Sequence, residues 1–193
     1  SNPYDYKREH RHTYYEIMLI ERGGGNQLID FKNYVAHDHS CYIICPQQIH
    51  LMNRNKSTGI ILQFTEERIQ SAELLSHLRQ LTFADDAAII FENNKAAFEE
   101  LTTLLRIIET QVNNDASLNL HAAVHLVQGF ISIMLASRQN KEGDKREADK
   151  QLLIAFYQLL ELHYKANRGV QYFIEMLGST EKKLGAATKK FTG

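Results

Sequence analysis

A set of polar residues near the amino terminus has the spacing of a ligand-binding site. His10, His12, Tyr14 and Glu16 alternate with other residues, so in a β-strand their side chains would leave the same face of the sheet. His50, in a second strand-like segment, could meet them from a neighbouring strand. Imidazole and carboxylate groups bind Zn, Fe, Mn, Ni or Cu, and such side chains also orient organic ligands in pockets. The spacing therefore predicts one site with two alternative occupants: an organic ligand contacted by all five residues, or a metal held by His10, His12, Glu16 and His50.

A basic segment at the carboxyl terminus could bind a second kind of partner. Between Ser179 and Gly193 the chain carries four lysines and one glutamate, and a short helical segment, Val170–Leu177, precedes them. Two helices joined by a tight turn form a helix-turn-helix, whose second helix enters the major groove of DNA. The alternative is a solvated helix face, which is what most charge runs are. The residues predicted to contact DNA are Ser179, Thr180, Lys182, Lys183, Lys189 and Lys190.

Apolar and hydroxyl residues in the same segment favour a docked helix. Leu184 and Phe191 would pack on the preceding helix and fix the angle at which the two helices cross. Ser179 or Thr180 could cap the amino end of the second helix, because a hydroxyl oxygen accepts a hydrogen bond from a backbone N–H of the first turn. This context favours the DNA-binding interpretation.

Composition and charge indicate a globular chain without a membrane segment. The chain has 193 residues, of which 44% are hydrophobic, and its net charge of −1 gives no overall attraction to nucleic acid or anionic lipid. We find no apolar run long enough for a bilayer and no apolar signal core at the start, so we expect no membrane partner. In an extended strand, Cys41 and Cys45 would lie about 13 Å apart at about 3.3 Å per residue, too far for a disulfide. Reduced cysteines indicate a cytoplasmic protein.

Residues 10–64 have the pattern of short strands. Gly23–Asn26 and Lys32-Asn33 are typical of turns, and Pro46 ends an apolar run. Closely spaced strands and turns predict a sandwich or barrel. The expected strands are His12–Ile20, Gln27–Phe31, Tyr42–Cys45, Ile49–Met52 and Gly59–Phe64.

The chain after Thr65 has the pattern of helices. Apolar residues recur at helical spacing in Lys95–Val112, and Leu118–Ser137 is apolar almost all round. Because this pair has more apolar surface than a small barrel can bury, we expect a second copy of the chain to cover part of it. The predicted contacts in that homodimer are Leu126, Phe130 and Met134. A charged linker over 138–149 and a further helix, Lys150–Ala166, complete an α+β chain.

Both ends of the chain resemble one family. The stretch Gly169–Gly193 resembles the first helix-turn-helix of AraC-type (arabinose-regulator-like) transcriptional regulators, which end this helix with a similar leucine, basic residues and Thr-Gly. The stretch His10–Gly23 looks like the cupin sensor domain of that family, as do Ile29-Asp30, Tyr34 and Cys45–His50. The helical middle of the chain is similar in type only.

The resemblance implies a fold, a division into domains and a function. It implies a cupin-like β-barrel (jelly roll) in 1–68, a helical dimerisation hairpin in 69–137, a linker in 138–149 and a partial DNA-binding domain in 150–193. The implied protein is a bacterial transcriptional regulator and not an enzyme, with no cofactor expected. A small-molecule effector, for which a carbohydrate is one candidate, would contact His10, His12, Tyr14, Glu16 and His50. Its binding would modulate sequence-specific binding to promoter DNA.

The chain departs from the pattern of these regulators at two points. They carry two helix-turn-helices in the DNA-binding domain, and this sequence contains the first alone, so we expect a truncated domain. Where relatives often carry Gln and Arg toward the bases, this chain has Gly185 and Ala186, which leaves Lys182 as the best candidate for a base contact.

The histidine spacing also resembles a second class of cupin. His10, His12, Glu16 and Gly23 match the first motif of metal-binding cupin enzymes, and the segment from Pro46 to His50 resembles part of the second motif. Gln48 lies where those enzymes have a glycine. The alternative function is therefore a metal-dependent cupin enzyme, of dioxygenase or isomerase type, with a helical appendage and a divalent metal.

Overall fold

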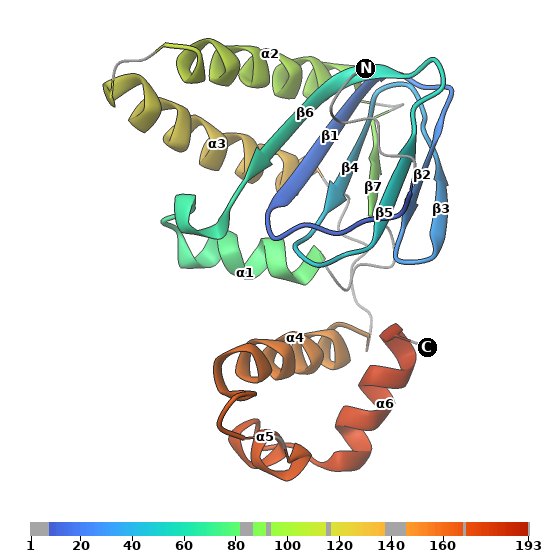
Figure 1. The fold of residues 1–193 in the computed structure, drawn as a ribbon, viewed down its shortest axis with the longest axis vertical. Helices are drawn as coiled ribbons and strands as arrows, with labels where there is room; N and C mark the ends of the chain where they lie inside the picture. The colour runs from blue at the N-terminus through green and yellow to red at the C-terminus, as the bar shows by residue number, and fades with distance from the viewer. Residues whose placement is uncertain are drawn as a thin grey trace. The chain divides into compact units, whose positions relative to one another are not determined.

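The chain divides into two compact units in the computed structural model, which describes residues 8–81, 87–91, 94–114, 117–137, 146–167 and 169–192. The larger unit covers residues 1–82 and 86–139, and the smaller unit covers 83–85 and 140–193. Figure 1 shows the elements of each unit. The sheets and the helices of the predicted segments 1–68 and 69–137 belong to the same unit, because they share one hydrophobic core.

The larger unit contains two antiparallel sheets in its described part. The first has the order β6-β1-β4-β7 and the second has the order β3-β2-β5 (Figure 1). The strands of the first sheet are β1 (Tyr15–Arg22), β4 (Ser40–Ile44), β6 (Thr58–Phe64) and β7 (Ala88–Ile90). Those of the second sheet are β2 (Asn26–Ile29), β3 (Lys32–Val35) and β5 (His50–Asn53).

Successive side chains of β1 belong in turn to two different hydrophobic clusters. Met18 and Ile20 pack with residues of both sheets, so this cluster fills the space between the sheets. The alternate residues, Tyr15, Ile17 and Leu19, belong to a larger cluster that joins the first sheet to the helices. Because successive side chains of a strand point to opposite faces, Glu16 is directed to the same side as Met18 and Ile20.

Three helices cover the outer face of the first sheet (Figure 1). They are α1 (Ala72–Leu81), α2 (Lys95–Val112) and α3 (Ser117–Ser137), and a short 3-10 turn, η1 (Glu66–Arg68), precedes them. The Asn94 side chain caps α2 by accepting a hydrogen bond from the Ala97 N–H at 3.3 Å. Buried residues from these helices, such as Leu78 and Leu101, complete the larger cluster.

The predicted dimer contacts lie on the inner side of α3. Phe130 and Met134 are fully buried within their own chain, and Leu126 packs partly against the same cluster. A second copy cannot touch the first two side chains, so their assignment to an interface is wrong. When a helix is apolar on all sides, its sequence does not show which side packs against the sheet of the same chain.

The expectation that no apolar run is long enough to cross a bilayer is wrong for α3. Leu118–Ser137 spans 20 residues with a mean hydropathy of 1.5, which is enough to cross a membrane by length and composition alone. Its most buried residues pack into the core of the unit. A core helix passes the same test, so this single segment is weak evidence for a membrane location.

Both cysteines are reduced and fully buried in or beside β4. The Cys41 Sγ lies 3.8 Å from the Met134 Sδ, and the Cys45 Sγ lies 3.8 Å from the carbonyl oxygen of Leu78. The prediction of reduced cysteines in the core is confirmed.

Two strands of the larger unit, β3 and β7, lie where the sequence predicted no strand. The turn predicted at Lys32-Asn33 lies instead at Asp30 and Phe31, whose φ angles are 42° and 69°, and Lys32 begins β3. A two-residue turn with both φ angles positive joins antiparallel strands tightly. The other difference is β7, which pairs with β4 in a region where only helices were expected.

The smaller unit consists of three helices in its described part. They are α4 (Arg146–His163), α5 (Val170–Met176) and α6 (Glu181–Thr192). Its buried residues include Leu153, Ile154, Phe173, Leu184 and Ala187. Residues 146–149, predicted as the end of the linker, form the first turn of α4 instead, and residues 138–145 lie outside the described residues.

Candidate functional site

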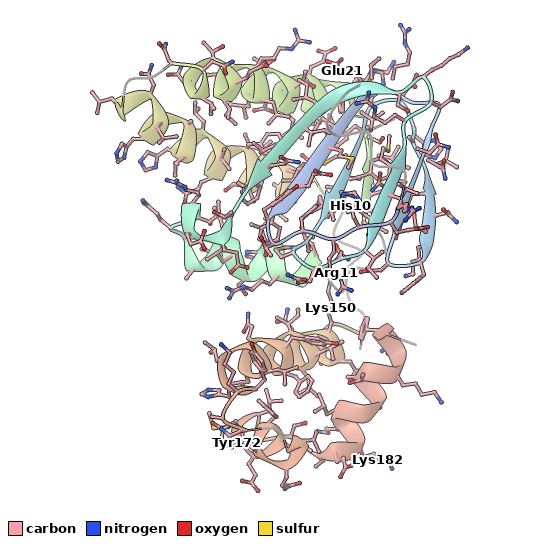
Figure 2. The ribbon with its side chains drawn as sticks, in the orientation of Figure 1. His10, Arg11, Glu21, Lys150, Tyr172 and Lys182 are labelled. Carbon is pink, nitrogen blue, oxygen red and sulfur yellow. The ribbon has the colours of Figure 1, made fainter. Side chains whose placement is uncertain are left out.

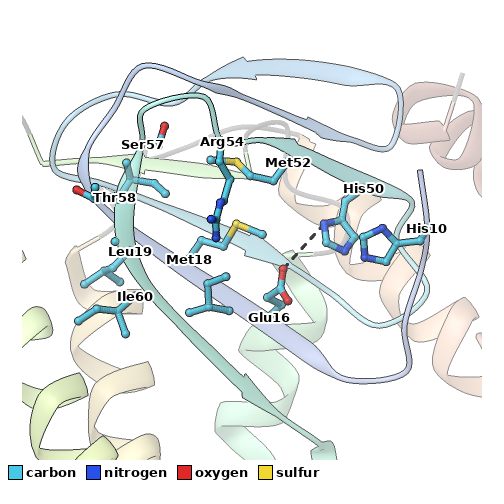
Figure 3. Close-up of a pocket in the computed structure, with 13 residues that line it drawn as sticks. His10, Glu16, Met18, Leu19, His50, Met52, Arg54, Ser57, Thr58 and Ile60 are labelled. Carbon is cyan, nitrogen blue, oxygen red and sulfur yellow. Dashed lines mark ion pairs between the residues drawn. The ribbon is translucent and has the colours of Figure 1, made fainter. Parts of the chain in front are cut away.

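A cavity of about 300 Å³ opens beside β1, β5 and β6 in the larger unit. Figure 3 shows its polar side chains. The side chains that give the cavity its chemistry are His10, Glu16, Met18, His50, Met52 and Arg54. In Figure 3 the Arg54 side chain reaches along the cavity toward Met18 and Glu16.

Backbone pairing holds the histidines together. The His10 N–H donates to the His50 carbonyl at 3.1 Å, and the His50 N–H donates to the His10 carbonyl at 2.9 Å. His50 begins β5, which pairs with β2 in a register that sets His50 opposite Ile29. His10 and His12 therefore reach the site from a segment that precedes β1, and not from one continuous strand.

The three imidazoles lie close together. The ring centre of His50 lies 4.3 Å from that of His10 and 4.9 Å from that of His12. The His12 ring also stacks on Tyr14, with centres 3.9 Å apart and planes at 5°. This stacking fixes the plane of the His12 ring.

Glu16 brings a carboxylate to the same place. Its residue surface is 5% exposed. One carboxylate oxygen, Oε2, accepts a hydrogen bond from the Gln63 Nε2 at 2.6 Å. The other, Oε1, lies 4.0 Å from the Nδ1 of His50 (Figure 3). Glu16 is thus a buried acceptor held from one side by Gln63.

Hydrogen bonds assign the ring nitrogens. The Nδ1 of His12 lies 2.8 Å from the Tyr14 carbonyl, which only accepts hydrogen bonds, so Nδ1 carries the proton of the neutral ring and Nε2 carries the lone pair. The Nδ1 of His50 lies 3.2 Å from the Gln27 Nε2. The Nε2 atoms of His12 and His50 and the Oε1 of Gln27 are buried without a hydrogen-bond partner among the described residues.

Burial keeps both buried histidines neutral. Burial, together with the nearby imidazoles of His10 and His12, lowers the pKa of His50 to about 3. Burial also lowers the pKa of His12, although the Glu16 carboxylate and the hydrogen bond to Tyr14 oppose this effect. At neutral pH both rings therefore offer lone pairs.

The structure groups the predicted site residues in two ways. His10, Glu16 and His50 line the cavity, whereas His12 and Tyr14 are not among its lining residues. One donor atom from each of His12, Glu16 and His50 lies within 4.8 Å of the other two, and His10 is outside this set of possible metal ligands. Sequence reasoning missed Arg54, because it follows β5 in a turn and belongs to no periodic pattern.

The smaller unit carries the other candidate surface. Lys182, Lys183 and Lys189 are exposed on α6, and Lys182 is marked in Figure 2. The Thr180 Oγ1 accepts from the Lys183 N–H at 3.3 Å, so Thr180 caps the helix as expected. The Lys190 Nζ lies 2.9 Å from the Asp149 Oδ2 on α4. Lys190 therefore has a partner within its own unit.

Ser179 and the buried residues fix the position of α6. The Ser179 N–H donates to the Ile174 carbonyl at 3.1 Å, at the end of α5. Leu184 is buried as expected, whereas Phe191 is partly exposed. The Ser179 backbone thus stabilises the turn between α5 and α6.

Comparisons with known proteins identify a family. A model of the AraC-like ligand binding domain matches residues 1–160. No curated protein matches the chain. Among solved structures, the AraC-like transcriptional activator CuxR is similar, with 13% sequence identity and a TM-score of 0.46. That similarity covers 92% of this chain and 61% of the chain of CuxR, so the chain spans less than two thirds of that protein's length.

Proposed function

Because this chain belongs to the family of AraC-like ligand-binding domains, we propose that it is the sensing part of a bacterial, cytoplasmic transcription regulator. A small-molecule effector binds in the larger unit and changes how strongly the regulator binds promoter DNA. Such a change requires that the effector bind two arrangements of the protein with unequal affinity. The family supports this role over the metal-dependent enzyme that the histidine spacing also suggested.

The cavity beside β1 is the observation that carries the effector proposal. It combines the carboxylate of Glu16, the imidazoles of His10 and His50 and the guanidinium of Arg54 with an apolar wall that includes Met18. A few polar groups on an apolar wall are typical of small-molecule sites. The effector is a polar molecule, and a carbohydrate or sugar acid has the hydroxyl and carboxylate groups that these side chains would bind.

A thermal-shift screen against monosaccharides and sugar acids tests this effector proposal. A compound that binds the folded chain raises its melting temperature. For such a compound, Glu16→Gln should weaken binding by at least about tenfold, because a hydrogen bond to a charged group contributes about 1.5–3 kcal/mol. Glu67→Gln, at an exposed position on η1, is the matched control and should bind with unchanged affinity. The proposal fails if no compound raises the melting temperature, or if both variants bind equally well.

The smaller unit is proposed as the DNA-contacting part. In a helix-turn-helix the second helix enters the major groove with its amino-terminal residues at the bases. In this unit α6 would be that helix, with Lys182 and Lys183 in its first turn and the cap Thr180 before it. Lys189 is suited to a phosphate, whereas Lys190 would have to leave Asp149.

The salt dependence of DNA binding should show these contacts. Fluorescence anisotropy with a labelled duplex at several salt concentrations gives the slope of log K against log salt. Replacing Lys182, Lys183 and Lys189 by Gln should flatten this slope by up to about 0.9 for each lost phosphate contact. Replacing Lys32 and Lys56, both exposed in the larger unit, by Gln is the control and should leave the slope unchanged. An unchanged slope in the triple variant would exclude α6 from the interface.

A homodimer is proposed on a different face from the one expected. The exposed apolar residues at the joined ends of α2 and α3 are Val112 at 56%, Leu118 at 79% and Leu120 at 48%. Exposed apolar side chains of neighbouring elements favour an interaction surface. A second copy of the chain would cover this surface and pair two smaller units.

A further inference from the structure

We propose that His121 and His125 bind a divalent transition-metal ion that joins two copies of the chain through α3. Both residues are exposed on this helix and lie four positions apart. The inference rests on the homodimer proposed above, because the second copy supplies the remaining ligands of the ion. It does not depend on the cavity or on the buried histidines beside β1.

The spacing of His121 and His125 suits one metal ion. Residues four apart in a helix lie on the same face, with Cβ atoms about 5–6 Å apart. Two histidines at this spacing hold zinc in the helical motif H-E-x-x-H. No hydrogen bond or ion pair with another described residue occupies either imidazole. Both rings are therefore available to an ion from solvent.

One chain supplies only part of the ligands that zinc needs. Structural zinc sites have four ligands in a tetrahedral arrangement, and this histidine pair provides two of them. Among the described residues, the one group of three or more candidate metal ligands consists of His12, Glu16 and His50, so the pair on α3 has no third ligand nearby. A second copy of the pair would fill the two remaining positions and complete a site of four imidazoles.

The exposed side of α3 has the composition of a helix that is covered by another chain. The 21 residues of α3 include no Asp, Glu, Lys or Arg, whereas the exposed residues of α2 include Glu99, Arg106 and Glu109. A helix face that stays in water usually carries charged and polar residues. The exposed residues that follow one face of α3, at intervals of three and four, are Leu118, His121, His125, Gly129, Ser132 and Ala136.

A second copy of α3 fits this uncharged face. Two identical faces without charge meet without like-charge repulsion, and in a two-fold dimer the same residues of both copies face each other. Leu118, which is 79% exposed, lies on the same face and belongs to the proposed dimer surface. In Figure 1 the joined ends of α2 and α3 extend away from the sheets. A histidine pair near the two-fold axis would therefore meet its own copy.

The ligand type narrows the choice of metal. Imidazole nitrogens suit Zn, Cu and Ni, and a tetrahedral set of four ligands favours Zn²⁺. Mg²⁺ takes oxygen ligands in octahedral geometry and retains several waters. We therefore expect ZnCl₂ to strengthen the dimer and MgCl₂ to have no effect.

Sedimentation equilibrium of the full chain in EDTA, in ZnCl₂ and in MgCl₂ tests the proposal. Zinc should lower the dissociation constant of the dimer by about 10–100-fold, which is the usual range for coupling between two binding events. The value in MgCl₂ should equal the value in EDTA. In a calorimetric titration with ZnCl₂, the wild type should bind one more ion for every two chains than the double variant His121→Ala, His125→Ala.

Three variants identify the ligands. The double variant His121→Ala, His125→Ala should dimerise in ZnCl₂ as it does in EDTA. A second variant, His125→Ala with Ala136→His, keeps the number of histidines but places the two about 22 Å apart at 1.5 Å per residue, so it should also lose the zinc effect. His77→Ala, at an exposed position on α1, is the matched control and should keep the effect. Because every substituted position is exposed, the circular dichroism spectra should be unchanged.

The outcomes separate this inference from the earlier proposals. It is overturned if zinc leaves the dissociation constant of the wild type unchanged, or if the double variant responds to zinc as the wild type does. A dimer of equal strength in EDTA and in ZnCl₂ would contradict the metal bridge and leave the homodimer proposal standing. A chain that remains monomeric in both would contradict the bridge and the homodimer. The thermal-shift screen decides the effector proposal independently of these results.

Discussion

Replacing Phe130 by Ala is expected to lower the free energy of unfolding of the larger unit by about 3–5 kcal/mol. The Phe130 side chain is fully buried in the cluster that joins α3 to the first sheet. Its removal loses the transfer free energy of the ring and leaves a cavity that close-packed neighbours cannot fill. Urea unfolding followed by circular dichroism measures the change.

A substitution at an exposed position of α3 distinguishes a role in the proposed dimer interface from a role in the core. Leu118 is 79% exposed, so Leu118→Glu should change the unfolding free energy of the monomer by no more than about 0.5 kcal/mol. If the proposed homodimer forms on this side, the same variant should shift the molar mass in light scattering from dimer to monomer. A small effect of Phe130→Ala on unfolding, together with loss of the dimer, would restore Phe130 to the interface and contradict the packing described.

Replacing Gly59 by Ala should lower the unfolding free energy by about 3 kcal/mol or more, because overpacking against backbone is among the costliest single changes. A β-carbon at Gly59 would lie 1.9 Å from the Leu19 carbonyl oxygen and 3.1 Å from the Ile20 Cα. Gly59 pairs with Ile20 between β6 and β1, and both contacts are to backbone atoms of β1. The two strands would have to separate. Because Gly59 also lines the cavity, a ligand found in the screen should bind more weakly.

Gly129 in the same unit provides the control for this change. A β-carbon there would meet no atom within 4 Å, and the residue is exposed within α3. Gly129→Ala should raise the unfolding free energy by about 0.5–1 kcal/mol, since alanine restricts the unfolded chain and favours helix. Chemical denaturation of the two variants in parallel gives both values. A Gly59→Ala variant as stable as wild type would mean that β1 and β6 are not held in this register.

The sequence predicted those strands whose apolar residues also pack into the core of the larger unit. β1 and β4 are buried almost throughout, and on β6 Phe64 is buried while Ile60 and Leu62 pack partly against the core, so the apolar runs that identify these strands also contribute to the core. β3 was missed because Lys32 and Asn33 are polar and favour turns, while the turn itself uses positive φ angles that a sequence does not show. β7 is only three residues long and exists through its pairing with β4, which is a tertiary effect.

The candidate site was predictable in its histidines and its carboxylate. The spacing of His10, His12 and Glu16 placed them together, and His50 joined them as expected. The sequence analysis assumed that one strand carries these residues. In the structure the chain before Tyr15 is not part of β1, and an isolated bridge pairs His10 with His50. The contribution of Arg54 depends on how β5 turns into β6, and no local pattern encodes that.

The two cysteines give the protein an internal reporter of opening events. Both thiols are fully buried, Cys41 in β4 and Cys45 at its end, and the first sheet sets β4 between β1 and β7. The sequence contains no other cysteine. A thiol-reactive dye can therefore attach only after the middle of this sheet is exposed, so its labelling rate follows the native-state fluctuations of that sheet. Ligand binding to the larger unit would be visible as slower labelling, without any engineered probe.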